Sequence, residues 1–287
     1  MTPRGRECPR PNPCANAPPR KRHSLRPFVE LTGVSHTYAT GGTLAVDGLD
    51  IRVNEGEFAA VVGPSGCGKS TLMKLATGLQ FPQAGAVVVD GKEVRDPVKI
   101  AGMAFQAPTL LPWRTTLENL MLPLEIVEPH RSRLRRHRSE YVAKAEALLA
   151  SVGLEGAGSR FPWQLSGGMQ QRASLCRALI HEPKLLMLDE PFGALDAFTR
   201  EELWCVIRDL HARMAGSLTI ILVTHDLREA VFLADRIFCM SARPGKIIAE
   251  REVGLARPRD LEITYTPEFS DIVHDLRARI GEARSAA

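Results

Sequence analysis

The stretch that decides the fold is Gly63-Pro-Ser-Gly-Cys-Gly-Lys-Ser-Thr71. It fits the spacing GxxxxGK[ST] and follows the continuous apolar run FAAVV, which is typical of a buried strand. From Lys69 to Leu79 the apolar positions recur at helical spacing. Glycines in such a loop let backbone N–H groups turn toward phosphate oxygens, and the start of the helix adds positive potential. The stretch therefore predicts a phosphate-binding loop between a strand and a helix.

The loop also supplies candidate ligands for a nucleotide and its metal ion. Lys69 places a full positive charge near the β- and γ-phosphates, and the hydroxyl of Ser70 is suited to Mg²⁺. We therefore expect ATP and Mg²⁺ to bind here. The loop residues assigned to the nucleotide are Gly63, Pro64, Ser65, Gly66, Cys67, Gly68, Lys69, Ser70 and Thr71.

Two acids follow a second apolar run, in the stretch LLMLDEP that begins at Leu185. They stand at the carboxyl end of a predicted strand, where open α/β sheets place their ligand sites. We expect Asp189 to hold Mg²⁺, directly or through water, and Glu190 to act as general base toward the attacking water.

The order of strand and helix patterns predicts the fold class. Short β-rich runs alternate with helical patterns from Phe28 onward, and strand runs are absent from about 107 to 180. The runs that begin at Phe28, Leu49 and Ala86 predict an antiparallel meander. We expect an α/β fold: a P-loop NTPase core with a mixed sheet, the antiparallel β meander and a helical subdomain inserted at about 107–180.

Composition and the two ends complete the predicted organisation. The chain has 287 residues, 44% of them hydrophobic, a net charge of +4 and no run of apolar residues long enough to span a membrane. Residues 1–27, rich in Pro and Arg, predict a disordered basic tail, 28–254 the ATPase domain, and 255–287 an extension with a short amphipathic helix. The basic run 130–138 is interpreted as a solvated loop or helix start, with contact to lipid headgroups or a partner as the alternative, and no nucleic-acid partner is expected.

A third motif narrows the choice among P-loop proteins. Leu165-Ser-Gly-Gly-Met-Gln-Gln-Arg172 resembles the signature of ABC ATPases. Ser166, Gly167 and Gly168 at a helix start form a second anion-binding end, with a hydroxyl and unobstructed N–H groups. In that family two domains face each other head to tail, and each ATP lies between the phosphate loop of one and the signature of the other. The resemblance therefore implies a second copy of this chain as partner.

The resemblance, which covers about residues 28–250, implies roles for further residues. Tyr38 resembles the aromatic residue that stacks on adenine, and Gln171 is assigned to the nucleotide with the signature. Gln106 matches the glutamine that senses Mg²⁺ and the γ-phosphate, and His225 the histidine that contacts the γ-phosphate. The implied catalytic residues are Glu190, His225 and Gln106; the implied metal ligands are Ser70, Gln106 and Asp189.

Other stretches resemble the importer subfamily for nitrate, sulfonate and taurine. They are LLPWRTTLEN from Leu110, SARPGK from Ser241 and PRD from Pro258. The resemblance implies an ATPase on the cytoplasmic face of the plasma membrane that contacts permease subunits and, indirectly, a solute-binding receptor. Trp113 is interpreted as an anchor for the permease or as part of the helical core. An exporter or lipid-handling ATPase and a non-transport ABC regulator are the alternatives.

Overall fold

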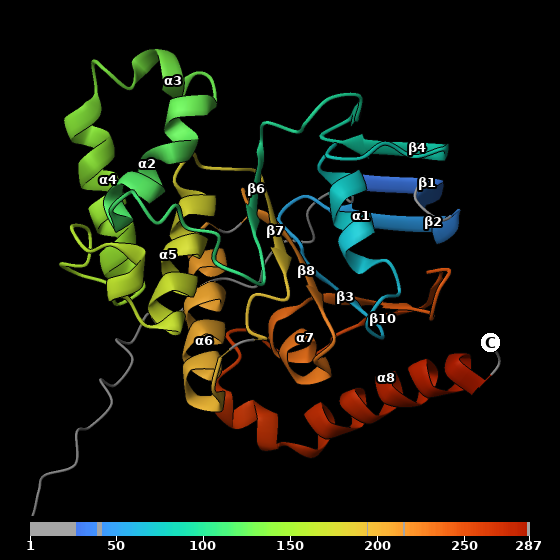
Figure 1. The fold of residues 1–287 in the computed structure, drawn as a ribbon. Coiled ribbons are helices and arrows are strands. Elements are labelled where there is room, and N and C mark those ends of the chain that lie inside the picture. Colours follow the sequence, from blue (N-terminus) through green and yellow to red (C-terminus); the bar gives the residue numbers. More distant parts are fainter. Residues whose placement is uncertain (1–26, 39–41, 194, 215, 286–287) are drawn as a thin grey trace, which may run out of the picture.

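A six-stranded sheet forms the centre of the molecule. We analysed a computed structural model, and the structure describes residues 27–38, 42–193, 195–214 and 216–285. The strand order is β10-β9-β3-β8-β7-β6, with β10 antiparallel to β9 and all other neighbours parallel (Figure 1). The bounds are β3 Phe58–Val62, β6 Ala101–Ala104, β7 Leu185–Asp189, β8 Thr219–Thr224, β9 Arg236–Met240 and β10 Ile247–Glu252.

The strands at the centre of this sheet are apolar because both of their faces are covered. Every residue of β3 and β8 is buried, as expected for parallel strands between two layers. The carboxyl ends of β3, β7 and β8 lie at the same edge, since the three strands are parallel neighbours. This edge receives the phosphate loop after β3, the two acids at the end of β7, and His225 after β8.

The antiparallel sheet has the order β2-β1-β4-β5, which confirms that the three predicted runs form one antiparallel sheet; β1 lies between β2 and β4. Its strands are β1 Pro27–Tyr38, β2 Thr43–Asn54, β4 Ala84–Val89 and β5 Lys92–Glu93. The inward side chains, such as Leu31 and Ile51, share a buried cluster with Leu72 and Leu75 of α1, which spans Lys69–Ala76. Helix α1 is therefore held between the two sheets.

The segment from 107 to 180 contains helices and no strand. Its elements are α2 Thr116–Ile126, α3 His130–Arg133, α4 Arg138–Ser151, the 3₁₀ turn η1 Pro162–Gln164 and α5 Gly167–Leu179. Thr115 and Glu118 form a capping box that fixes the start of α2. Leu120, Leu149 and Cys176 belong to the same buried cluster as the central sheet, so the helical lobe packs directly on the core.

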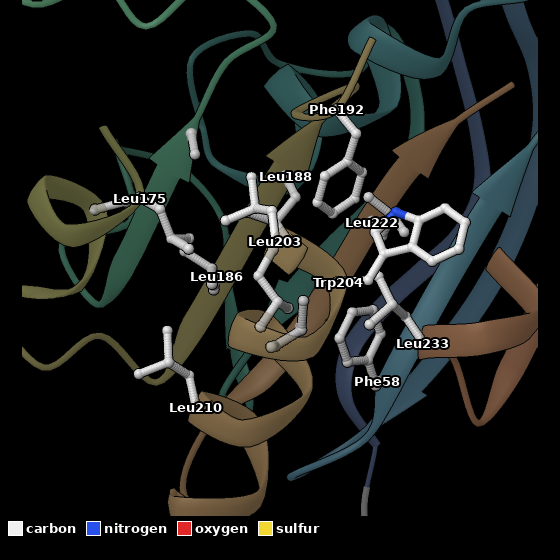
Figure 2. Packing of buried hydrophobic residues seen from close by; sticks show 14 of the residues in the cluster. Phe58, Leu175, Leu186, Leu188, Phe192, Leu203, Trp204, Leu210, Leu222 and Leu233 are labelled. Carbon is white, nitrogen blue, oxygen red and sulfur yellow. The ribbon is translucent and has the colours of Figure 1, made fainter. Parts of the chain in front are cut away.

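Helix α6, Ala197–Arg213, covers one face of the central sheet. Its apolar side chains recur at helical spacing and face strands β7 and β8, where the tight packing leaves little room for larger side chains. The residues of this contact labelled in Figure 2 are Leu203, Trp204 and Leu210 of α6 with Leu186, Leu188 and Leu222 of the strands.

The structure describes the whole basic run 130–138 but only the last residue of the predicted tail 1–27. The run 130–138 forms α3, a turn and the start of α4, and most of it is exposed. His130 is not merely solvated, because its ring lies 3.0 Å from the Tyr141 hydroxyl and 3.2 Å from the carbonyl oxygen of His181. The predicted tail at 1–27 lies outside the described residues, apart from Pro27, which already belongs to β1.

The C-terminal extension packs on the core. It contains η2, Leu261–Tyr265, and α8, Pro267–Ser285, which is longer than the short helix expected. Helix α8 lies against α7, Leu227–Leu233, and the edge strands of the central sheet (Figure 1). Its buried side chains are Phe269, Ile272 and Leu276.

Val273 and Ile280 of the same helix are only partly buried and pack against the hydrophobic core. No helix among the described residues combines the length and the apolar character that crossing a bilayer requires.

Candidate functional site

The phosphate loop has a conformation that only glycine permits at several positions. Gly66 and Gly68 have φ angles of 77° and 101°, in the left-handed region. A Cβ at Gly68 would also lie 2.7 Å from Val46 Cγ1 and 2.8 Å from the Ala45 carbonyl oxygen. The loop is thus held closely against β2, the strand that contains Ala45 and Val46.

Lys69 lies at the centre of this loop. Its side chain is 5% exposed, and the ammonium donates hydrogen bonds to the carbonyl oxygens of Gly63 at 2.9 Å and Pro64 at 3.1 Å. The same nitrogen is 3.7 Å from Glu190 Oε1. The structure therefore places the predicted phosphate-binding charge beside the predicted general base.

The two acids at the end of β7 have different surroundings. Asp189 accepts a hydrogen bond from Ser70 Oγ at 3.3 Å, and burial raises the pKa of its carboxyl, opposed by this hydrogen bond. Glu190 has a φ of 45° and lies 3.1 Å from His225 Nδ1. Three separate segments thus bring Ser70, Asp189, Glu190 and His225 to one edge, as the sequence predicted.

Tyr38 and Gln106 lie at the margins of this group. Tyr38, at the end of β1, makes a 3.0 Å hydrogen bond between its hydroxyl and Thr71 Oγ1. Gln106 follows β6, and its Nε2 is 3.5 Å from the point where a Cβ on Gly193 would stand. The Gln106 amide therefore lies close to Gly193, in the segment that follows Glu190.

The signature forms a helix start that is separate from the phosphate loop. Ser166 caps α5 by accepting a 3.3 Å hydrogen bond from the Met169 N–H. A Cβ at Gly167 would meet nothing within 4 Å, whereas one at Gly168 would lie 2.8 Å from Thr199 Cγ2 of α6. Gly168 therefore serves packing, and Gly167 leaves the helix start open. A cavity of about 350 Å³ adjoins this end, lined by Ser166, Gly167, Gly168, Met169, Arg172, Leu195, Asp196 and Thr199.

Gln171 is not placed with the other signature residues. Its side chain is 4% exposed and donates a 3.1 Å hydrogen bond to the Phe105 carbonyl oxygen. The structure therefore gives Gln171 a different task from the predicted nucleotide contact. It ties the signature helix to the residue before Gln106, at the junction of lobe and core.

A buried carboxyl that the sequence analysis missed lies behind His225. Glu229 is 3% exposed and accepts a hydrogen bond from Thr224 Oγ1, which in turn accepts the Asp226 N–H at 2.9 Å. Asp226 pairs with Arg200 at 3.4 Å, and Arg200 donates to the Leu195 carbonyl oxygen at 3.1 Å. These contacts join the loop of His225 to the loop that precedes α6. The four-residue spacing from His225 to Glu229 is the available sequence signal, since it puts the acid in the first turns of α7.

Replacing Glu229 by glutamine should remove part of the pH dependence of stability. Burial raises the pKa of the Glu229 carboxyl to about 8 from 4.5, so the folded state holds a proton that the unfolded state loses. The carboxyl thus favours folding below pH 4.5, and this contribution declines as pH rises toward about 8. The expected slope is at most about 1.4 kcal/mol per pH unit.

Urea unfolding of the parent and Glu229→Gln across that pH range measures this difference. The slope should be smaller in the variant, and the exposed Glu93→Gln should retain the parent slope. Equal slopes in all three proteins would show that Glu229 is ionised in the folded state.

A larger cavity adjoins the phosphate loop on the side that faces α8. It has a volume of about 850 Å³ and lies between residues 63–65, residues 225–228 and α8. It shares no lining residue with the cavity at the signature. The phosphate loop and the signature of one chain therefore adjoin different cavities.

Comparisons with known proteins agree with this geometry. Residues 46–193 match the family described as ABC transporter. An aliphatic sulfonates import ATP-binding protein, SsuB of Bacillus licheniformis, is 43% identical over 76% of this chain and 80% of its own length. The taurine import ATP-binding protein TauB of Escherichia coli K12 is 37% identical over 88% of this chain and 98% of its own.

A solved structure shows the same fold. It is the dimeric post-hydrolysis state of the ATP-binding cassette MJ0796 bound to ADP and Pi, which is 30% identical, has a TM-score of 0.66, and covers 79% of this chain and 100% of its own. The fold, the phosphate loop and the extent of these matches agree, so the chain belongs to the ABC transporter family, as one of its ATPases.

Proposed function

We propose that two copies of this chain bind and hydrolyse two ATP molecules between them and thereby power the import of a small solute. The observation that carries the proposal is the separation of the phosphate loop, at residues 63–71, from the signature, at residues 166–168. The cavity beside residues 63–65 and the cavity beside the signature share no lining residue. One chain cannot apply both motifs to one ATP in this arrangement. A head-to-tail pair can, because a two-fold axis brings each motif to its counterpart.

The residues at the loop divide the chemistry among them. Lys69 balances the negative charge that grows on the transferred phosphoryl group, and Glu190 accepts the proton of the attacking water. His225, 3.1 Å from Glu190, orients that carboxylate and faces the γ-phosphate.

The residues Ser70, Asp189 and Gln106 fit a Mg²⁺ ion. A hydroxyl oxygen and a carboxylate oxygen 3.3 Å apart can both coordinate one Mg²⁺ ion, and phosphate oxygens supply further ligands. When bound, the ion supplies positive charge at the phosphates.

Import is supported by the relatives and by the surface of the helical lobe. The sulfonate and taurine proteins named above are import ATP-binding proteins, and sulfonate, taurine, nitrate or a related solute is the proposed cargo. Trp113 is 71% exposed beside the start of α2, which favours an anchor over core packing. We place the protein on the cytoplasmic face of the membrane, with its lobe against a permease and a solute receptor beyond it.

Reconstitution tests the direction and the cargo. The ATPase, its permease and the solute receptor encoded nearby are assembled in vesicles, and ATP hydrolysis is measured with each solute in turn. Stimulation by receptor loaded with a sulfonate, taurine or nitrate is expected. ATP hydrolysis that ignores every receptor and solute would indicate an exporter or a non-transport regulator.

Trp113→Ala should weaken the binding of the ATPase to the permease by roughly tenfold or more, as removal of an aromatic anchor does. Tyr265→Ala is the matched control, because Tyr265 is 75% exposed on η2, away from the lobe. Binding is measured by titration onto permease in nanodiscs. Equal affinities for the two variants would place the permease contact elsewhere.

A further inference from the structure

Phe198 is the most exposed large apolar side chain in the described part of the chain, at 82%. It stands in the first turn of α6, whose start is fixed by Asp196 accepting a 3.1 Å hydrogen bond from the Thr199 N–H. Both of these neighbours line the cavity at the signature. A solvent-exposed aromatic ring on a rigid helix start is a typical contact residue for a second protein.

The cavity beside the phosphate loop offers such a contact. Leu227, Val273 and Ile280 give it apolar walls, and the last two come from α8. Val273 and Ile280 pack against the hydrophobic core and are only partly buried, whereas Phe269, Ile272 and Leu276 are the buried contacts of α8. The parts of Val273 and Ile280 that remain exposed line the cavity next to residues 63–65 of the phosphate loop.

Symmetry relates these two features. In the proposed head-to-tail pair, the surface around the signature of one copy meets the surface around the phosphate loop of the other, and the reverse. Phe198 lies beside the first surface, and the cavity walled by α8 lies beside the second. The pairing that delivers residues 166–168 to the partner's phosphate loop therefore also delivers Phe198 to the partner's α8.

We propose that Phe198 of each copy inserts into the cavity between the phosphate loop and α8 of the second copy. The inference rests on the proposed dimer and extends it: the C-terminal helix becomes part of the ATP-dependent interface. Helix α8 packs on α7, which begins two residues after His225. Closure of the dimer therefore acts, through α8, on the helix that follows this histidine.

Cross-linking tests the proposal in the Glu190→Gln chain, which keeps ATP bound. Phe198→Cys and Ile280→Cys are combined in one chain, with Cys8 and Cys14 replaced by serine, and a short bismaleimide is added. A covalent dimer that requires ATP is expected. Chains with either cysteine alone and the pair Tyr265→Cys with Ile280→Cys should remain monomeric on a denaturing gel.

The two ways of failing are distinguishable. If Glu190→Gln forms a dimer with ATP and the Phe198–Ile280 pair gives no covalent dimer, the docking of Phe198 is wrong and the proposed function stands. If Glu190→Gln stays monomeric with ATP, both are wrong.

A double-mutant cycle measures the same contact without a reagent. In the Glu190→Gln background with ATP, Phe198→Ala and Ile280→Ser should each raise the dimer dissociation constant by about tenfold. Together they should raise it little further, because both remove one contact. Tyr265→Ala should have no effect, and fully additive losses would overturn the pairing.

Discussion

Glu190→Gln is expected to lower ATP turnover by about a hundredfold or more, the range typical of a lost general base. The glutamine amide has the same shape as the carboxylate and cannot accept the proton of water. The pairing with Lys69, at 3.7 Å, and with His225, at 3.1 Å, shows that this carboxylate faces the charged part of the site. ATP affinity should persist, because the phosphate loop is unchanged. Single-turnover hydrolysis and nucleotide titration measure the two quantities.

Lys69→Ala is the contrasting variant. It removes the cation that meets the phosphates, so ATP binding should fall together with turnover. The pair of variants thus separates binding from chemistry. Hydrolysis by Glu190→Gln at the parent rate would show that another group is the general base.

Arg259→Met is expected to lower the free energy of unfolding by about 3 kcal/mol or more. The Arg259 guanidinium is 1% exposed and donates to five carbonyl oxygens, of Val231, Phe232, Ala234, Val253 and Leu255. Burial lowers its pKa to about 10, so the group is charged at neutral pH. Methionine fills similar space and leaves these buried oxygens without their donor.

Urea unfolding at neutral pH measures the loss. The control is Arg95→Ala, whose ion pair with Glu93 is exposed and should change stability by less than about 0.5 kcal/mol. The residues that Arg259 holds are the end of α7 and the chain after β10, so the extension should loosen first in hydrogen exchange. Arg259→Met as stable as the parent would mean that water replaces the guanidinium.

Most of the central sheet could be predicted because its strands are uniformly apolar. The runs that became β3, β7 and β8 are buried on both faces, and their composition carries that information. Strand β10 was not predicted, since partly buried and exposed residues alternate along it at the sheet edge and half of them are charged. The burial of Arg259 was equally hidden, because arginine is mostly exposed and its carbonyl partners come from distant turns.

The candidate site, too, could be predicted from the sequence only in part. Lys69, Asp189 and Glu190 could be predicted from the apolar runs that precede them, whereas His225 was assigned only by its resemblance to a family residue. All four follow parallel strands, whose carboxyl ends share an edge. Gln171 was misjudged since neighbours along a helix point in different directions, and its face turns into the lobe. The cavity walled by α8 depends on contacts between segments some 200 residues apart, which no local pattern records.

Sedimentation equilibrium of Glu190→Gln with and without ATP tests the central claim most directly, with bound nucleotide counted in the same samples. We expect a monomer without ATP, and with ATP a species of twice the mass that holds one ATP per chain. A monomer that binds ATP fully and never associates would contradict it, because the signature of a second copy would then have no part in the site.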